Sequence, residues 1–168
     1  MSEEIESTLE ENENPGTGEG TETPNEPGTG DTPTTTSSTS VINQAVESVI
    51  ALINELTLFA SITRGALGTG NTLACEIGPS GAEEVYLDKN QYIVLDLTIN
   101  GKHDNLQTLS DAMNTIHESL TMKKSYPSES KWKIVDITTL TEPQVIGRED
   151  NNAWMMASAL NVKVYTNL

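Results

Sequence analysis

Residues 131–165, KWKIVDITTLTEPQVIGREDNNAWMMASALNVKVY, decide the fold of this chain because they read as two long strands joined by a polar turn. Alternation in steps of two is typical of half-buried strands. It predicts a first strand with one face made of Trp132, Ile134, Asp136 and Thr138. It predicts a second strand with one face made of Trp154, Met156, Ser158, Leu160, Val162 and Val164. The turn between them consists of Glu149, Asp150, Asn151 and Asn152, and Asn and Asp tolerate left-handed backbone.

Residues 1–40 differ in composition from the rest of the chain, and we predict that they form a disordered acidic tail. They contain ten Asp or Glu residues, no Lys or Arg, four prolines and five glycines. So few apolar side chains cannot offset the roughly 1–2 kcal/mol of backbone entropy that each ordered residue loses. Residues 41–168 carry 15 acidic and 9 basic side chains, a net charge of −6, and their length suits one domain.

Two helices are predicted, over residues 41–58 and 104–122. Both show apolar residues at three- and four-residue spacing. In the second helix this stripe consists of Leu106, Leu109, Met113, Ile116 and Leu120. Ser40 is a candidate N-cap for the first helix, and Asp104 with Gln107 resembles a capping box for the second.

Three strands are predicted between these helices, over residues 72–77, 84–88 and 91–99. Residues 78–81, with the sequence GPSG, end the first strand, and residues 89–90 form a hairpin tip between the other two. The order is therefore helix, three strands, helix, two strands (α-β-β-β-α-β-β). It predicts an α+β fold in two layers, with two helices on one face of a mainly antiparallel sheet.

Candidate sites for phosphate or metal binding are weak. Gly65, Gly68 and Gly70 lack the following Lys-Ser/Thr of a phosphate-binding loop and lead into a strand, so we predict an ordinary loop. His103 and His117 match no metal-ligand spacing, and we predict that both are solvated surface residues. No metal or cofactor is therefore expected.

Catalytic candidates are equally few. Cys75 is the only cysteine, which excludes an intrachain disulfide, and we predict that it is a small buried side chain. The neighbouring carboxylates at residues 83–84 and 149–150 lie at strand ends or turns, where solvated charge is the ordinary explanation. We therefore expect that the protein is not an enzyme.

Lys123, Lys124, Lys131 and Lys133 form the one basic cluster of the sequence. Lysines suit a helix C-terminus, and a surface for an acidic partner is the alternative. The negative net charge disfavours nucleic-acid binding as the primary function.

The expected place of synthesis follows from the same composition. The N-terminus lacks the basic and apolar regions of a signal peptide, and the most apolar run, residues 45–60, contains Glu47 and Glu55. No membrane partner and a cytoplasmic place of synthesis are expected.

The chain resembles the siphophage tail-terminator or minor capsid (head–tail joining) proteins of phages that infect Gram-positive bacteria. The resembling features are the helix stripe of residues 106–120, W-x-I-x-x-I at 132–137, TEPQVIGRED at 141–150 and ALNVKVY at 159–165. The likeness covers residues 41–168, and the acidic tail has no counterpart in the family pattern.

The resemblance implies a subunit of a ring, expected to be hexameric, on the head-proximal end of the tail tube. Such a ring ends tube polymerisation and joins the tail to the head. Implied partners are further copies of the chain, the tail tube protein and a connector or neck protein, with DNA only as cargo passing through the lumen. The implied location is the tail or neck of the virion, after assembly in the host cytoplasm. The acidic tail is expected near the lumen or rim, unless it is a solubility-promoting extension.

Two alternatives remain open: another minor capsid or head-closure protein of the neck, and a small cytoplasmic binding module or enzyme with an unrecognised pocket. In the ring hypothesis, the hairpin arm around residues 144–153 contributes to subunit contacts. Its candidate interface residues are Gln144, Arg148, Glu149, Asp150 and Trp154. Arg148 offers a planar fork for a neighbouring carboxylate. A solvated hairpin tip is the alternative for this segment.

Overall fold

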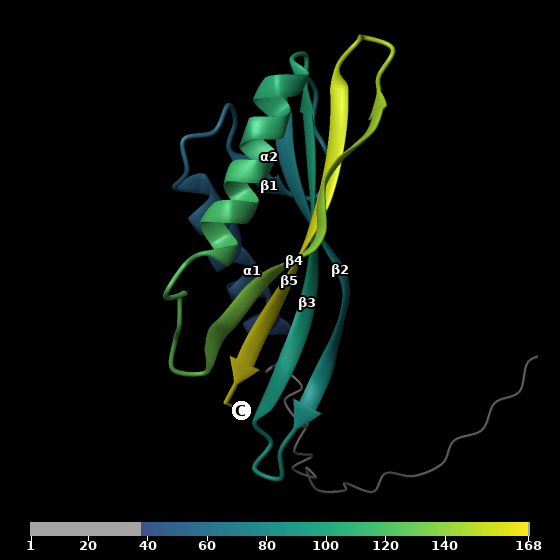
Figure 1. Ribbon diagram of the computed structural model, residues 1–168. Coiled ribbons are helices and arrows are strands. Elements are labelled where there is room, and N and C mark those ends of the chain that lie inside the picture. Colours follow the sequence, from purple (N-terminus) through teal and green to yellow (C-terminus); the bar gives the residue numbers. More distant parts are fainter. Residues whose placement is uncertain (1–37, 168) are drawn as a thin grey trace, which may run out of the picture. The chain divides into compact units, whose positions relative to one another are not determined.

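The computed structural model describes residues 38–167 (Figure 1), so nearly all of the predicted tail of residues 1–40 lies outside the described part of the chain. The described residues form two helices and five strands. In chain order these are α1 (Ser38–Asn54), β1 (Ile62–Arg64), β2 (Thr72–Val85), β3 (Gln91–His103), α2 (Leu106–Thr121), β4 (Trp132–Arg148) and β5 (Trp154–Thr166). The predicted order of elements is confirmed.

The strands form one sheet with the order β1-β2-β3-β5-β4. The pairs β2–β3, β3–β5 and β5–β4 are antiparallel, and the short β1 runs parallel to β2. The strand that comes last in the sequence, β5, therefore lies between β3 and β4. The prediction of a mainly antiparallel sheet is confirmed.

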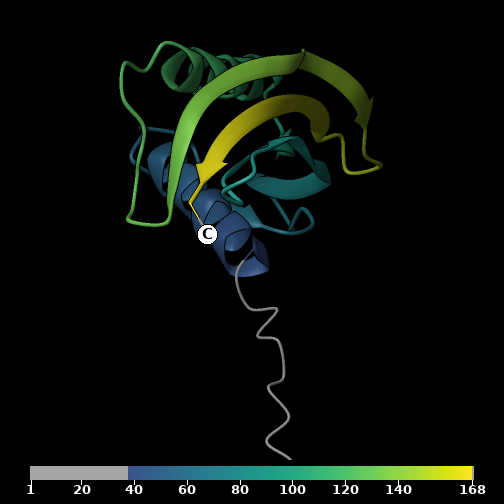
Figure 2. The ribbon, with the colours of Figure 1, turned by 90° about the horizontal axis from the view of Figure 1, so that it is seen from below.

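Both helices lie on the same side of the sheet, which curves around them (Figures 1 and 2). They share one apolar core with the inward-facing residues of β3 and β5. The predicted stripe of α2 is confirmed, since Leu109, Met113, Ile116 and Leu120 are buried in this core. The indole Nε1 of Trp132 donates to Oε1 of Gln44 at 2.9 Å, which ties the start of β4 to α1.

The helix caps differ from the prediction. α1 begins at Ser38, so Ser40 lies inside the helix rather than capping it. α2 is capped by Asn105, whose side chain accepts from the backbone N–H of Thr108 at 3.1 Å. The predicted capping box of Asp104 and Gln107 is wrong because β3 continues to His103 and moves the helix start by one residue.

The predicted strands 72–77 and 84–88 are a single strand, β2, which keeps its pairing with β3 across the GPSG segment. The register shifts between Ile77 and Ser80, so Pro79, which has no N–H to donate, falls in a bulge. Strand β1 was not predicted. It is held by Asn54, which accepts from the backbone N–H of Ile62 at 2.8 Å and donates to its carbonyl at 3.2 Å.

The predicted inner face of β4 is correct only as far as Ile134. A register shift between Ile134 and Asp136 turns the following residues over, so Asp136 is exposed and Ile137 is buried. In β5 the predicted face is confirmed from Met156 to Val164, where every second residue is buried, while Trp154 is half-buried.

Candidate functional site

Strand β4 forms an edge of the sheet and is interrupted by four register shifts against β5. It has 17 residues and β5 has 13, so each shift places one extra residue on β4. Three of the residues in these shifts are apolar and exposed: Val135 (38%), Leu140 (55%) and Ile146 (53%). The adjacent Val145 is 48% exposed. We call these four side chains the edge stripe.

The physical cause of the edge stripe is the bulging of β4. A bulged residue leaves the regular alternation of inner and outer faces, so its side chain is not covered by the helices or by the neighbouring strand. Exposed apolar side chains along the edge of a sheet are candidates for contact with another protein. The edge stripe is therefore the leading candidate for an interaction surface.

The arm, residues 144–153, is anchored to the rest of the sheet rather than free-standing. β5 pairs with β3 as far as Trp154 opposite His103. At the tip, Lys102 Nζ donates to Glu149 Oε1 at 3.1 Å, although Lys102 itself is only 6% exposed. The buried ammonium thus holds the tip against the end of β3.

Two of the predicted interface residues lie together at the base of the tip. The guanidinium of Arg148 lies 4.7 Å from the ring centre of Trp154, a cation–π distance. Arg148 Nε also donates to the carbonyl of Asn152 at 2.9 Å, and Asn152 adopts a φ of 70°. The planar fork of Arg148 is therefore used partly within its own hairpin.

The other predicted residues are placed differently. Glu149 is engaged by Lys102, as described, and Asp150 is exposed at the tip. Gln144 is exposed beside Ala157, several residues from the tip. Sequence reasoning did not find Lys102, because its partner is 47 residues away and no local motif marks the pair.

The predicted lysine cluster borders a hollow at the start of β4, with a volume of about 440 Å³. Its lining includes Lys123, Lys124 and Lys133, the serines 125 and 128, the exposed Val135 and one carboxylate, Asp136, so its formal charge is net positive. Lysine ammonium groups and serine hydroxyls can donate hydrogen bonds to carboxylates. This hollow suits an acidic group with an apolar neighbour.

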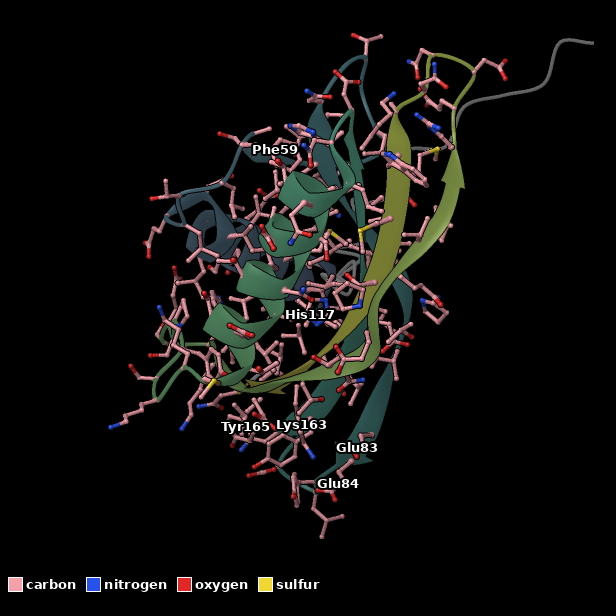
Figure 3. All side chains as sticks on the ribbon, turned by 45° about the horizontal axis from the view of Figure 1, so that its top comes forward. Phe59, Glu83, Glu84, His117, Lys163 and Tyr165 are labelled. Carbon is pink, nitrogen blue, oxygen red and sulfur yellow. The ribbon has the colours of Figure 1, made fainter. Side chains whose placement is uncertain are left out.

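A second hollow, of about 610 Å³, lies at the β2–β3 turn and is lined by Tyr86, Tyr92 and Tyr165. The Lys163 ammonium lies 4.8 Å from the ring centre of Tyr92 and forms an ion pair with Glu83 at 2.6 Å. Figure 3 shows Glu83, Glu84, Lys163 and Tyr165 at this end of the sheet. A hydrogen bond to Glu84 raises the pKa of Tyr86 to about 12.

His117 corrects the prediction of a solvated surface histidine. Its ring is 5% exposed between α2 and β4, where Nδ1 lies 2.8 Å from Thr139 Oγ1 (Figure 3). Nε2 is buried and has no hydrogen-bond partner among the described residues. Burial lowers the pKa of His117 below its usual value, against an opposing effect of Glu142.

The remaining candidates also take structural positions. His103 is half-buried, stacks edge-on against Phe59 at 4.6 Å, and its Nδ1 accepts from the backbone N–H of Asn105. Cys75 is buried as predicted, and burial raises the pKa of its thiol to about 11. Gly65, Gly68 and Gly70 lie in or beside the β1–β2 loop and lead into a strand. Within residues 38–167, no three His, Cys, Asp or Glu side chains are grouped to hold a metal ion.

Comparisons with known proteins give structural similarity but no sequence match. No family model matches the chain, and no curated protein matches it. A solved structure described as the virion of a native gene transfer agent (GTA) particle contains a similar chain. The two chains share 14% sequence identity with a TM-score of 0.47, over 74% of this chain and 91% of that chain. Neither α1 nor α2, the helices of the described region, is long and apolar enough to cross a membrane.

Proposed function

We propose that this protein is a structural subunit of a phage virion, and that its copies assemble into a ring. The ring caps the head-proximal end of the tail tube, ends tube polymerisation and joins the tail to the neck. The observation that carries the proposal of self-assembly is the edge stripe, four exposed apolar side chains on the bulged edge of β4. The virion assignment rests on the resemblance of residues 41–168 to siphophage tail-terminator or minor capsid proteins.

Burial of the edge stripe of one subunit supplies a modest amount of free energy. About half of each side chain is exposed, so burying all four contributes roughly 3–6 kcal/mol, given ~1.5–3 kcal/mol for fully burying one such residue. Association costs about 4–15 kcal/mol in lost rigid-body freedom. The two amounts are comparable, so the second contact that each subunit makes in a closed ring adds to the stability of the assembly.

The bulges of β4 also determine which groups form the contact between copies. A regular edge strand offers an unbroken row of backbone N–H and C=O groups to another strand, which promotes open-ended association. The four register shifts of β4 interrupt that row. The contact between copies is therefore made by side chains and does not extend the sheet.

The first experiment tests ring formation with the purified full-length chain, using native mass spectrometry and negative-stain microscopy. The variant Leu140→Ser/Ile146→Ser should stay monomeric and keep the circular dichroism spectrum of the wild type. Leu87→Ser is the matched control, because Leu87 is an exposed apolar residue at the β2–β3 turn, away from β4. Rings that survive the loss of the stripe, or a wild type that remains monomeric, would contradict the proposal.

A second experiment distinguishes a tail terminator from a head-closure or other neck protein. This is needed because the same edge stripe could form the subunit contact in either kind of ring. The purified chain is mixed with the tail tube protein of its own phage and, separately, with the neck proteins. A terminator should cap tubes at one end and arrest their growth. Binding to neck proteins without any effect on tube length would assign the chain to another ring of the neck.

A further inference from the structure

Six of the nine basic side chains in residues 38–167 form no ion pair with a described carboxylate, and four of these six lie between the end of α2 and the start of β4; the other two are Lys89 and Arg148. Arg64, Lys102 and Lys163 form ion pairs with carboxylates of their own chain. Lys123, Lys124, Lys131 and Lys133 form none with any carboxylate of residues 38–167. Three of these four line the hollow at the start of β4. A concentration of free cations is thus present in a domain whose net charge is negative.

The arm at the other end of β4 is net acidic, with Glu149 and Asp150 against the single cation Arg148. Glu142 and Asp150 are exposed and form no ion pair with a described residue. Val145 and Ile146 of the edge stripe lie between them in the sequence and are also exposed. The arm therefore presents carboxylates together with apolar side chains.

The hollow offers the complement of this mixture. It combines the lysine ammonium groups and two serine hydroxyls with the exposed side chain of Val135, and Met122, 79% exposed, is the residue before Lys123. The hollow is net positive although it contains Asp136, and the arm is net negative although it contains Arg148, so the two surfaces are complementary in net charge and both carry exposed apolar side chains. Complementary charges at an interface give specificity and speed association more than they raise affinity.

The tip of the arm cannot reach the hollow of its own subunit. Tip and hollow lie at opposite ends of β4, whose paired length equals the 13 residues of β5, about 40 Å at ~3.3 Å per residue. We propose that the arm of one copy, with Asp150 at its tip and Glu142 just before its first residue, binds the lysine hollow of the next copy. The contact is heterologous, because each subunit uses one surface on one side and the other surface on its other side.

This inference rests on the proposed function and deepens it by naming the two surfaces that meet in the ring. In the contact, Val145 and Ile146 of one copy lie beside Val135 of the next copy. One end of the edge stripe in the first copy therefore covers the other end of the edge stripe in the second copy. The ion pairs are at the rim and partly solvated, so salt weakens them. Ring formation should therefore decline when the salt concentration is raised from about 50 mM to about 500 mM.

The test is a charge-reversal cycle on the full-length chain, read by sedimentation velocity. Glu142→Lys/Asp150→Lys reverses the arm, and Lys123→Glu/Lys124→Glu reverses the hollow. Each variant alone should weaken self-association at least ~10-fold, and the chain that carries all four substitutions should recover it. Glu76→Lys/Glu118→Lys is the control, because it changes the net charge as the arm variant does but at exposed sites on β2 and α2.

The outcomes separate this inference from the proposed function. Recovery in the fourfold variant, with an unaffected control, supports the arm-to-hollow contact. Rings that form equally well in both reversed variants, or a fourfold variant that fails to recover while keeping its circular dichroism spectrum, overturn the contact and leave the ring standing. A wild type that never self-associates overturns both.

Discussion

The ammonium of Lys102 lies 3.1 Å from Oε1 of Glu149, and this ion pair joins the buried end of β3 to the tip of the arm. The Lys102 side chain is 7% exposed and the Glu149 side chain is 35% exposed. A nearly buried ammonium therefore depends on one carboxylate for its compensating charge. The orientation of the tip, and with it the position of Asp150, follows from this pair.

Replacing Glu149 by Ala should lower the free energy of unfolding by about 1–3 kcal/mol, because the buried ammonium loses its charged partner. Urea unfolding followed by circular dichroism measures the change. Asp150→Ala is the control, since it removes a neighbouring carboxylate that is exposed, and it should change stability by less than about 0.5 kcal/mol. Equal effects of the two substitutions would show that Lys102 does not need Glu149.

Gly101 lies where β3 passes beneath α2, and Gly101→Ala should destabilise the fold by about 1–3 kcal/mol. An added Cβ would lie 2.7 Å from Leu109 Cδ1 and 3.1 Å from Leu73 Cδ2, so the core must shift to admit it. Gly81→Ala in β2 is the matched control, because no atom lies within 4 Å of its added Cβ. Thermal unfolding of both variants tests the difference, and a neutral Gly101→Ala would mean that the core is loosely packed there.

Stability should fall as the pH is lowered through the region of the histidine pKa, and His117 should account for part of this loss. Burial lowers the folded-state pKa of His117 below the usual value near 6.5, so the unfolded chain binds the proton more readily. The contribution of the neutral ring is present above pH ~6.5 and is lost as the pH falls towards the lowered folded-state pKa.

Urea unfolding at pH 7.5 and at pH 5.5 measures this effect, and His117→Gln should lose less stability between the two values than the wild type. His103→Gln is the control: it removes a histidine that is less buried than His117, and it should lose as much stability between the two pH values as the wild type. A wild type and a His117→Gln variant with the same loss would exclude this role for the ring. Glu142 faces His117 and should be kept intact in both chains.

The Cys75 thiol should resist labelling in the folded protein. Burial raises its pKa to about 11, so only about one molecule in a thousand carries a thiolate at pH 8, and the side chain is inaccessible. Reaction with a disulfide reagent should be at least ~100-fold slower in buffer than in denaturant. Fast labelling under native conditions would show that β2 opens locally.

The parts of the fold that depend on local periodicity were predictable from the sequence. The stripe of α2 and the buried face of β5 repeat without interruption, and both predictions are confirmed. The faces of β4 were not predictable beyond Ile134, because a bulge changes the side-chain alternation and depends on pairing with a distant strand. The three-residue strand β1 is too short to show a period.

The candidate site was predictable only in outline. The sequence indicated the arm and the lysine cluster, since both consist of consecutive or nearly consecutive residues. The edge stripe depends on which residues of β4 fall in bulges, and the buried positions of Lys102 and His117 depend on partners far away in the sequence. Contacts of this kind are set by tertiary structure, which no local pattern reports.

The position of β5 between β3 and β4 has a consequence for how the chain is made. A ribosome releases β4 before β5, yet β4 pairs in the sheet only with β5. Until residues 154–166 have been synthesised, β3 and β4 both lack β5, the strand with which each of them pairs. The hydrogen bond from Trp132 to Gln44 of α1 then joins the helix to a strand that is not yet part of the sheet. The β4–β5 pairing is a local hairpin, whereas the β3–β5 pairing joins residues far apart in sequence, and such pairings form slowly. The sheet, and with it the paired edge formed by β4, can therefore be completed only once residues 154–166 have been synthesised.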